Sequence, residues 1–217
     1  MQPELVIWDW NGTLLDDVDL CVDALNRLLA RFGYPQQYDR RQYRSIFGFP
    51  VEEYYLRAGF DFTRHPFCEL AESYMADYVP SSQACPLAEG AEEALETFRR
   101  AGLRQVILSA SKISTLEAQV TQRGIRPYFD RLLGLGDIYA RSKVEAGLAY
   151  LRESGLDPAR AVMIGDTDHD AEAAGALGVQ CILQAGGHQP REVLARTGTE
   201  TAADLRGALR IVLSLER

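Results

Sequence analysis

The chain has 217 residues, of which 47% are hydrophobic and 25% are charged, and its net charge is −8. This length suits one domain, or a core with a smaller unit inserted, and it is sufficient to bury a substantial core. The acidic balance argues against a nucleic-acid surface, which needs clustered positive charge, but a bound divalent cation would still allow an anionic small substrate.

The cysteines are scattered, and none has the spacing of a zinc site or a disulfide framework. Thiols of this kind suit the reducing cytosol. The sequence shows no signal-peptide pattern and no apolar run near the ~18 residues that a transmembrane helix needs. We therefore expect a cytoplasmic protein that binds neither nucleic acid nor membrane, as a monomer or a homodimer.

The first predicted strand is the apolar run 5–8. Apolar residues then recur at helical spacing in four segments, 18–32, 41–47, 51–57 and 66–79. None of this region is typical of a strand. We therefore predict that residues 16–85 form an all-helical unit inserted after the first strand.

From Pro86 onward, helices alternate with short apolar strands. The predicted helices are 90–100, 114–123, 144–154 and 169–177, and the predicted strands are 105–108, 131–135, 161–164 and 179–183, with only helical segments after them. This alternation indicates parallel βαβ units in a doubly wound α/β sheet covered on both faces. The core would comprise residues 1–15 and 86–217, with ligands beyond the carboxyl ends of its strands.

Chemically active side chains follow the ends of these strands. Asp9 follows the first strand within Asp-Trp-Asn-Gly-Thr, and Ser109 ends the next strand of the core. Lys143, one of only two lysines, precedes a helix, and Gly165 to Asp170 contains three carboxylates. Each residue alone is as readily a cap or a solvated side chain. Three neighbouring carboxylates, however, repel one another unless a cation offsets them.

Together the four segments resemble the four motifs of the haloacid dehalogenase superfamily, particularly its phosphoglycolate phosphatase-like members with a helical cap after the first strand. The resemblance rests on Asp9 with Thr13, on Ser109, on Lys143, and on Asp166 with Asp170. It spans essentially the whole chain and implies a magnesium-dependent phosphatase that acts on a small phosphorylated metabolite.

The resemblance also implies a role for each residue. Asp9 would be the nucleophile that forms an aspartyl-phosphate, and Thr13, Ser109 and Lys143 would bind the phosphoryl group. Mg²⁺ would be bound by Asp9, the main-chain carbonyl of Asn11 and Asp166. Asp170 would act on the metal indirectly or orient Lys143. Lys112 is the competitor for the role of Lys143.

One residue departs from the family pattern, because Asn11 stands where the second carboxylate is expected. An amide cannot transfer a proton, a contribution worth typically ~10²–10⁴-fold in rate. Three explanations compete: the leaving group departs unprotonated, another group supplies the proton, or turnover is not the function. The candidates for a replacement acid are His169, His188 and the inserted-unit residues Glu52, Glu53 and His65.

Substrate choice is expected to lie with the helical unit, where Arg44 is a candidate contact among arginines and tyrosines around residues 47–50. Two other functions stay open: a protein of the same fold that binds a phosphorylated ligand with little turnover, and a metal-free 2-haloacid dehalogenase. The acidic segment 165–170 argues against the dehalogenase. A phosphonoacetaldehyde hydrolase is rejected because residues 16–86 contain no lysine, and a mutase needs the acid–base group that Asn11 lacks.

Overall fold

The computed structural model describes residues 3–139 and 143–215, so the ends of the predicted core and residues 140–142 lie outside the described residues. The core is a parallel sheet with the strand order β3-β2-β1-β4-β5-β6. Its strands are β1 (Leu5–Trp8), β2 (Arg104–Lys112), β3 (Arg131–Leu135), β4 (Ala161–Gly165), β5 (Gln180–Gln184) and β6 (Glu200–Ala202). The predicted doubly wound α/β fold is confirmed.

The expectation that only helices follow the fifth strand is wrong. β6 pairs in parallel with β5 at the edge of the sheet, where Leu183 lies opposite Thr201. A strand of three residues is too short to show a hydrophobic period, which is why the sequence pattern does not reveal it. The predicted second strand was also too short, since β2 extends to Lys112.

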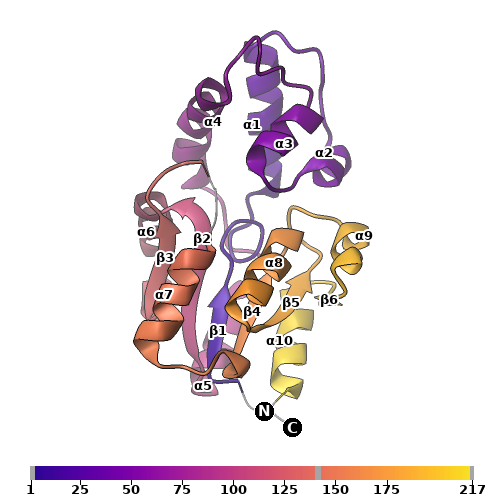
Figure 1. Cartoon of the computed structure of the whole chain (residues 1–217). Coiled ribbons are helices and arrows are strands. Elements are labelled where there is room, and N and C mark those ends of the chain that lie inside the picture. Colours follow the sequence, from indigo (N-terminus) through magenta and orange to yellow (C-terminus); the bar gives the residue numbers. More distant parts are fainter. Residues whose placement is uncertain (1–2, 140–142, 216–217) are drawn as a thin grey trace.

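Helices cover both faces of the sheet (Figure 1). One face packs against α5 (Ala91–Arg100), α6 (Ile113–Gln122) and α10 (Leu205–Ser214). The other face packs against α7 (Val144–Ser154) and α8 (Asp168–Leu177), and the short α9 (Arg191–Leu194) lies beyond the β5–β6 edge. Alternate residues of β1 therefore enter different clusters, with Val6 and Trp8 on one side and Leu5 and Ile7 on the other.

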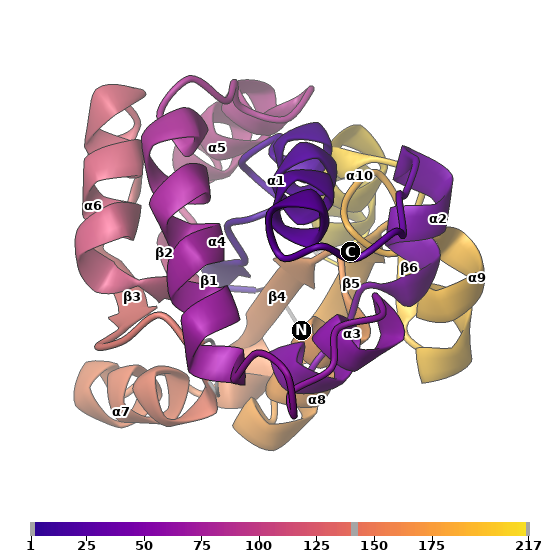
Figure 2. The ribbon, with the colours of Figure 1, turned by 90° about the horizontal axis from the view of Figure 1, so that it is seen from above.

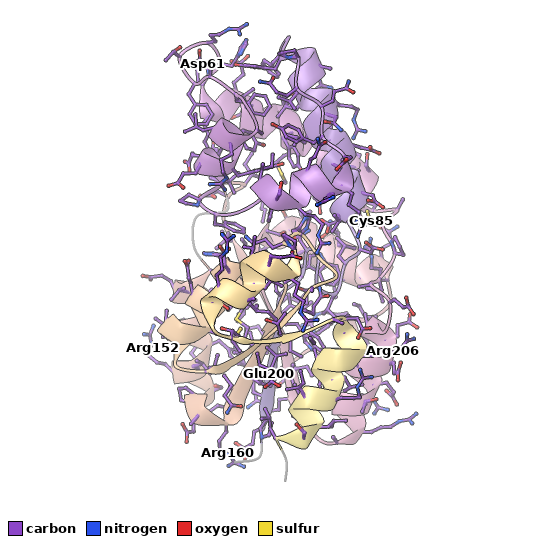
Figure 3. The ribbon with its side chains drawn as sticks, turned by 90° about the vertical axis from the view of Figure 1, so that its right-hand side faces the viewer. Asp61, Cys85, Arg152, Arg160, Glu200 and Arg206 are labelled. Carbon is purple, nitrogen blue, oxygen red and sulfur yellow. The ribbon has the colours of Figure 1, made fainter. Side chains whose placement is uncertain are left out.

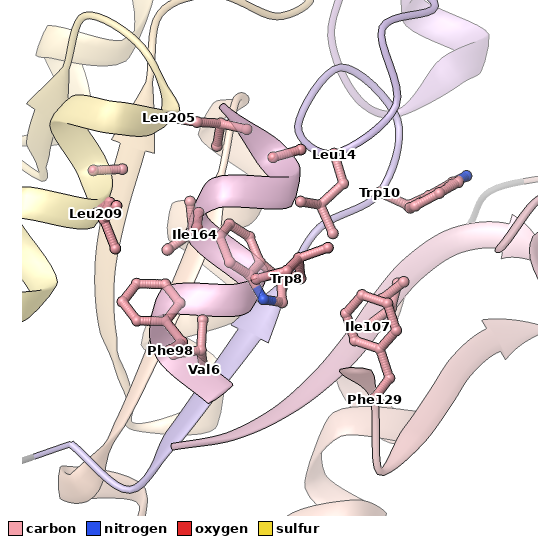
Figure 4. Packing of buried hydrophobic residues seen from close by; sticks show 14 of the residues in the cluster. Val6, Trp8, Trp10, Leu14, Phe98, Ile107, Phe129, Ile164, Leu205 and Leu209 are labelled. Atoms are coloured by element: carbon pink, nitrogen blue, oxygen red, sulfur yellow. The ribbon is translucent and has the colours of Figure 1, made fainter. Parts of the chain in front are cut away.

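The larger cluster contains both tryptophans (Figure 4). Trp8 packs against Phe98 with 5.7 Å between ring centroids, and its Nε1 donates to Gln105 Oε1 at 2.9 Å. Trp10 Nε1 donates to Gln119 Oε1 at 2.7 Å. A buried indole needs such a partner for its N–H group. These two hydrogen bonds fix the backbone on either side of Asp9.

The inserted unit stands above the carboxyl ends of the strands (Figures 1 and 2). It consists of α1 (Val18–Arg31), α2 (Arg40–Ile46), α3 (Val51–Arg57) and α4 (Phe67–Ser82). These helices bury an apolar cluster of their own that contains Leu25, Leu28 and Tyr54. Figure 3 shows Asp61 at the outer end of this unit and Cys85 where the chain returns to the core. We refer to residues 16–85 as the cap, the extent proposed from the sequence.

Candidate active site

Asp9 lies directly beyond β1, at the centre of the sheet, and its backbone N–H donates to the carbonyl of Ile164 at 2.9 Å. The residue is 8% exposed. One carboxylate oxygen accepts from Lys143 Nζ, and the other lies 3.3 Å from Thr13 Oγ1. Burial raises the pKa of Asp9 well above its usual value, as do the nearby charges of Asp170 and Asp166, while Lys143 lowers it.

The turn after Asp9 depends on a glycine. Gly12 has φ of +71°, and a Cβ there would lie 2.4 Å from Asp166 Oδ2 and 2.4 Å from His188 Cδ2. A side chain at position 12 would therefore push the first loop away from the loop after β4. With glycine, Thr13 Oγ1 can donate to Asp166 Oδ1 at 2.9 Å.

Lys143 is the buried cation of the site. It lies immediately before α7, is 2% exposed, and donates to Asp9 Oδ1 and to Asp170 Oδ1, the latter at 2.5 Å. Burial alone would lower its pKa, but the charges of Asp170 and Asp9 raise it above the usual lysine value. Lys112, the alternative candidate, is exposed. The structure therefore brings Lys143, and not Lys112, to the nucleophile.

Asp170 holds Lys143 in place. Its second oxygen accepts from the backbone N–H groups of Asp166 and Thr167 and from Thr167 Oγ1. Burial would raise its pKa, but Lys143 and Thr167 lower it below the usual value. The negative charge of Asp170 is therefore stabilised by Lys143, by Thr167 and by two backbone N–H groups, and Asp170 in turn fixes the position of Lys143.

Asp166 is the third buried carboxylate of the site. Its oxygens accept from Thr13 Oγ1 and, at 2.6 Å, from the backbone N–H of His188. Burial raises its pKa to about 6, with a further contribution from Asp170. Carboxylate oxygens of Asp9, Asp166 and Asp170 lie within 4.8 Å of one another.

This donor set fits a hard divalent cation, because such ions prefer carboxylate and carbonyl oxygens. Lys143 is a single positive charge that pairs with Asp9 and Asp170, while Asp9, Asp166 and Asp170 are three buried carboxylates. A divalent cation would offset the remainder. Asp9 and Asp166 are the residues best placed to hold it.

Ser109 lies within β2, next to the central strand, and is 1% exposed. Its hydroxyl accepts from the backbone N–H of Ser111 at 3.0 Å. Ser109 lines a cavity of about 60 Å³ together with Asp9, Lys143, Asp166 and Asp170. These five predicted core residues therefore surround one small space. Thr13 does not line it, because this residue is fully buried with its hydroxyl against Asp9 and Asp166.

Asn11 lies at the rim of this cavity and belongs to a second polar network. Its amide nitrogen donates to Asp17 Oδ2 at 2.8 Å and to the Tyr78 hydroxyl at 2.7 Å. Its carbonyl oxygen accepts from Ser111 Oγ at 2.6 Å. Tyr78 also donates to Asp17 Oδ2 at 2.6 Å. A carboxylate at position 11 would face the carboxylate of Asp17, whereas the amide supplies the donor that Asp17 accepts.

His188 completes this network. Its Nε2 lies 3.2 Å from Asp17 Oδ1, its Nδ1 lies 2.9 Å from the Tyr43 hydroxyl, and Phe47 stacks on its ring. Burial alone would lower the pKa of His188, but Asp17 raises it above the usual value. Burial in turn favours a raised pKa for Asp17, but the charge and hydrogen bond of His188 lower it.

The other candidates lie in different settings. Arg44 donates to the carbonyls of Ala185 and Gln189 at 2.6 and 2.7 Å, and so ties α2 to the loop after β5. His65 lies against Tyr34 inside the cap. His169 lines the catalytic cavity and stacks on Phe49 at 4.3 Å, and its buried Nε2 has no hydrogen-bond partner among the described residues.

Sequence reasoning missed three members of the network around Asn11: Asp17, Tyr78 and Ser111. Asp17 is the second of two adjacent aspartates, and Tyr78 falls on the apolar period of its helix, so neither stands out locally. The only available signal was Asn11 itself, since a buried amide needs partners for its two N–H groups.

Comparison with known proteins places this geometry in a family. The family described as haloacid dehalogenase-like hydrolase matches residues 6–184. The tyrosine-protein kinase PtkA of Mycobacterium tuberculosis is 29% identical over 218 residues, which cover 95% of this chain and 72% of PtkA. The phosphoglycolate phosphatase of Pseudomonas putida is 27% identical over 216 residues, which cover 95% of this chain and 79% of that enzyme.

A solved structure has the same fold. The predicted phosphatase from Clostridium acetobutylicum superposes with a TM-score of 0.84 over 99% of this chain and 100% of its own, at 18% sequence identity. The family match spans most of the chain and includes Asp9, Ser109, Lys143, Asp166 and Asp170. The chain therefore belongs to the haloacid dehalogenase-like hydrolase family.

Proposed function

We propose that the chain is a magnesium-dependent phosphatase that hydrolyses a small phosphorylated substrate through an aspartyl-phosphate on Asp9. The observation that carries the proposal is the single cavity around which Asp9, Ser109, Lys143 and Asp166 converge. These residues come from different segments of the chain that meet at the carboxyl ends of the strands: Asp9 follows β1, Ser109 lies in β2, Asp166 follows β4 and Lys143 precedes α7. Phosphatases among the relatives support the same reaction.

The reaction has two steps. A carboxylate oxygen of Asp9 attacks phosphorus, and the bond between phosphorus and the leaving oxygen breaks with its electron pair. Water then attacks the aspartyl-phosphate, releases inorganic phosphate and restores the Asp9 carboxylate. Lys143 and Ser109 hold the phosphoryl oxygens in both steps, and Asp170 keeps Lys143 in position.

Mg²⁺, when bound by Asp9, Asp166 and the main-chain carbonyl of Asn11, supplies positive charge that lets the anionic phosphate approach the anionic nucleophile. The protein's own contribution is the rigidity of these donors. Thr13 and the backbone of His188 fix both oxygens of Asp166. The carboxylates are thus set before substrate arrives, which reduces the reorganisation needed during reaction.

The test is the release of inorganic phosphate from acetyl phosphate and from a panel of small phosphate esters, with Mg²⁺ and with a chelator. We expect Asp9→Asn to abolish release while the fold is retained, and radiolabelled phosphate to become attached to the parent protein but not to the variant. Release unaffected by the chelator, or equal rates for Asp9→Asn and the parent, would overturn the proposal.

A second candidate is a protein that binds a phosphorylated ligand with little turnover, and Asn11 is the observation that favours it. It predicts tight binding of phosphate esters with no release of phosphate. The metal-free dehalogenase stays an alternative to be tested by halide release. Cytoplasmic location and a monomeric or homodimeric state remain predictions; no helix in the described part of the chain could span a membrane.

A further inference from the structure

A second and larger cavity opens from the phosphoryl site into the cap. It measures about 160 Å³. Asn11, Phe47, Phe49, Ala110 and His188 line both cavities. The larger cavity therefore begins where the phosphoryl site ends, which is where the leaving group of a bound phosphate ester would extend.

Aromatic side chains of the cap are the commonest kind of residue in the wall of this cavity. They are Phe47, Phe49, Tyr54, Tyr55, Phe67, Tyr74 and Tyr78. The rings pack on one another edge to face, as in the pairs Phe47–Tyr54 at 5.2 Å and Tyr55–Phe67 at 5.4 Å. A further aromatic ring in this cavity would find partners for edge-to-face or offset-stacked contacts, which aromatic pairs prefer.

The cavity is a poor place for a charged leaving group. The lysine that lines it, Lys112, is exposed, and its buried histidine, His188, is already engaged by Asp17 and Tyr43. A carboxylate entering this space would lose its water without gaining a free buried cation among the described residues, at a large cost. The buried hydroxyl of Tyr54 does lack a hydrogen-bond partner within the described chain, so a neutral acceptor on the ligand would suit it.

We propose that the substrate is a phosphate monoester of a phenol whose single aromatic ring occupies this cavity. The inference rests on the phosphatase function proposed above. Cavities of about 150 Å³ lined by apolar side chains hold one benzene ring, which matches the volume here.

Asn11 supports the same substrate class independently of the cavity. When the Asp9 oxygen bonds to phosphorus, the bond to the aryl oxygen breaks and the phenolate leaves with the electron pair. A phenolate is far less basic than an alkoxide, so it needs little protonation in the transition state and takes its proton from water afterwards. With such a leaving group, the lack of a proton donor at position 11 would cost little in rate.

The experiment separates the ring from the basicity of the leaving group. Benzyl and ethyl phosphate both release alkoxides, but only the first carries a ring. We expect kcat/KM for benzyl phosphate to exceed that for ethyl phosphate by about tenfold to a hundredfold, the effect of burying one ring, and phenyl phosphate to exceed both. We expect phosphoglycolate to be a poor substrate.

Two variants of α4 form a matched pair. Ala71 lines the cavity and is buried, whereas Ala76 on the same helix is exposed. We expect Ala71→Leu to reduce the benzyl-to-ethyl ratio at least tenfold and Ala76→Leu to leave it unchanged. If Ala71→Leu does not fold by circular dichroism, Met75→Trp, which adds volume at another residue that lines the cavity, is expected to reduce the same ratio.

Equal rates for benzyl and ethyl phosphate, a preference for phosphoglycolate, or a ratio unaffected by filling the cavity would overturn the proposal. Failure of the phosphatase function is recognised separately, because acetyl phosphate carries no ring and would then release no phosphate either. In that case calorimetry with benzylphosphonate and ethylphosphonate still decides the point. If benzylphosphonate binds more tightly than ethylphosphonate and this difference is lost in Ala71→Leu, the cavity binds an aromatic ring. Equal binding of the two phosphonates contradicts the proposal.

Discussion

Asn11 is held in place by its partner at position 17. Asn11→Asp alone would place two carboxylates at the 2.8 Å separation now spanned by a hydrogen bond. We expect this variant to lose about 1–3 kcal/mol of unfolding free energy, the cost of a broken buried hydrogen bond. Repulsion raises the pKa of the pair in the folded state, and such a group stabilises the fold only while it is protonated. The deficit should therefore shrink as the pH is lowered, which denaturant titrations at several pH values will measure.

Exchanging the two side chains tests the same contact from the other direction. In Asn11→Asp combined with Asp17→Asn, one amide again faces one carboxylate, so we expect the stability lost at this contact to return. The charge pairing of position 17 with His188 is lost in this variant, so the recovery should be partial. The carboxyl group then stands where it can protonate a leaving oxygen. The rate on ethyl phosphate should rise more than the rate on acetyl phosphate, which needs little protonation. Equal gains on both substrates would show that proton transfer was not limiting, and His169 would be the next residue to replace.

The two lysines provide a direct test of the buried cation. Lys143→Met removes the charge between Asp9 and Asp170 but keeps a long side chain. Removing one partner of a buried ion pair costs about 3–5 kcal/mol, so we expect lower stability and a loss of phosphate release. Lys112→Met, at an exposed position, should retain both within a factor of a few. The stability of Lys143→Met and Lys112→Met is to be compared by thermal unfolding, and their activity by the release of phosphate.

At the scale of elements, the start of α8 serves both folding and the site. Thr167 and Asp170 form a capping box at this end, and Thr167 Oγ1 donates to Asp170 Oδ2 at 2.7 Å. Thr167→Ala should lower the unfolding free energy by about 0.5–2 kcal/mol, as for other N-caps. It should also reduce phosphate release, because Asp170 loses a donor and holds Lys143 less firmly.

The N-cap of α10 is the matched control. The Asp204 side chain accepts from the backbone N–H of Gly207 at 2.7 Å, and neither residue lines the catalytic cavity. Asp204→Ala should therefore cost similar stability with no specific loss of activity. If Thr167→Ala and Asp204→Ala lose activity in proportion to their loss of stability, the N-cap hydrogen bonds of α8 have no separate role in the site.

Elements and site differ in how far the sequence predicts them. Strongly periodic helices such as α1 and α7 were predicted to within a residue, because a buried stripe imposes its period on the sequence. Residues at strand ends were also foreseeable, because parallel topology brings those ends together. The partners of Asn11 were not, since Tyr78 reaches the core only when the cap is folded over it. The edge strand β6 was missed because three residues carry no period.

At the scale of the whole molecule, the cap and the core have separate apolar clusters. Between them lie polar contacts and two ring stacks, Phe47 on His188 and Phe49 on His169. Arg44 and Tyr43, both on α2, contact Ala185, Gln189 and His188 of the core. Polar contacts of this kind are exchanged for water more easily than a packed apolar interface. We therefore expect the cap to move as a unit while the core stays folded.

We expect Arg44→Ala to weaken this closure without unfolding either part. The KM for benzyl phosphate should rise, because the aromatic-lined cavity is enclosed by residues of both the cap and the core. Hydrogen exchange of residues 185–189 should also accelerate. The neighbouring Arg41 is exposed, so Arg41→Ala is the control and should change neither quantity. A KM unchanged in Arg44→Ala would show that this residue does not hold the cap closed.

The central position of β1 also governs the order in which the molecule can form during synthesis. Leu5 lies opposite Arg104 on one side and Ala161 on the other, so β1 leaves the ribosome long before either of the strands with which it pairs. The cap helices lie close together in sequence and can associate first. Non-local parallel pairing is slow and leaves apolar strands exposed in the meantime. During that interval the nascent chain would present the folded cap attached to an unpaired apolar strand, which is a site for aggregation.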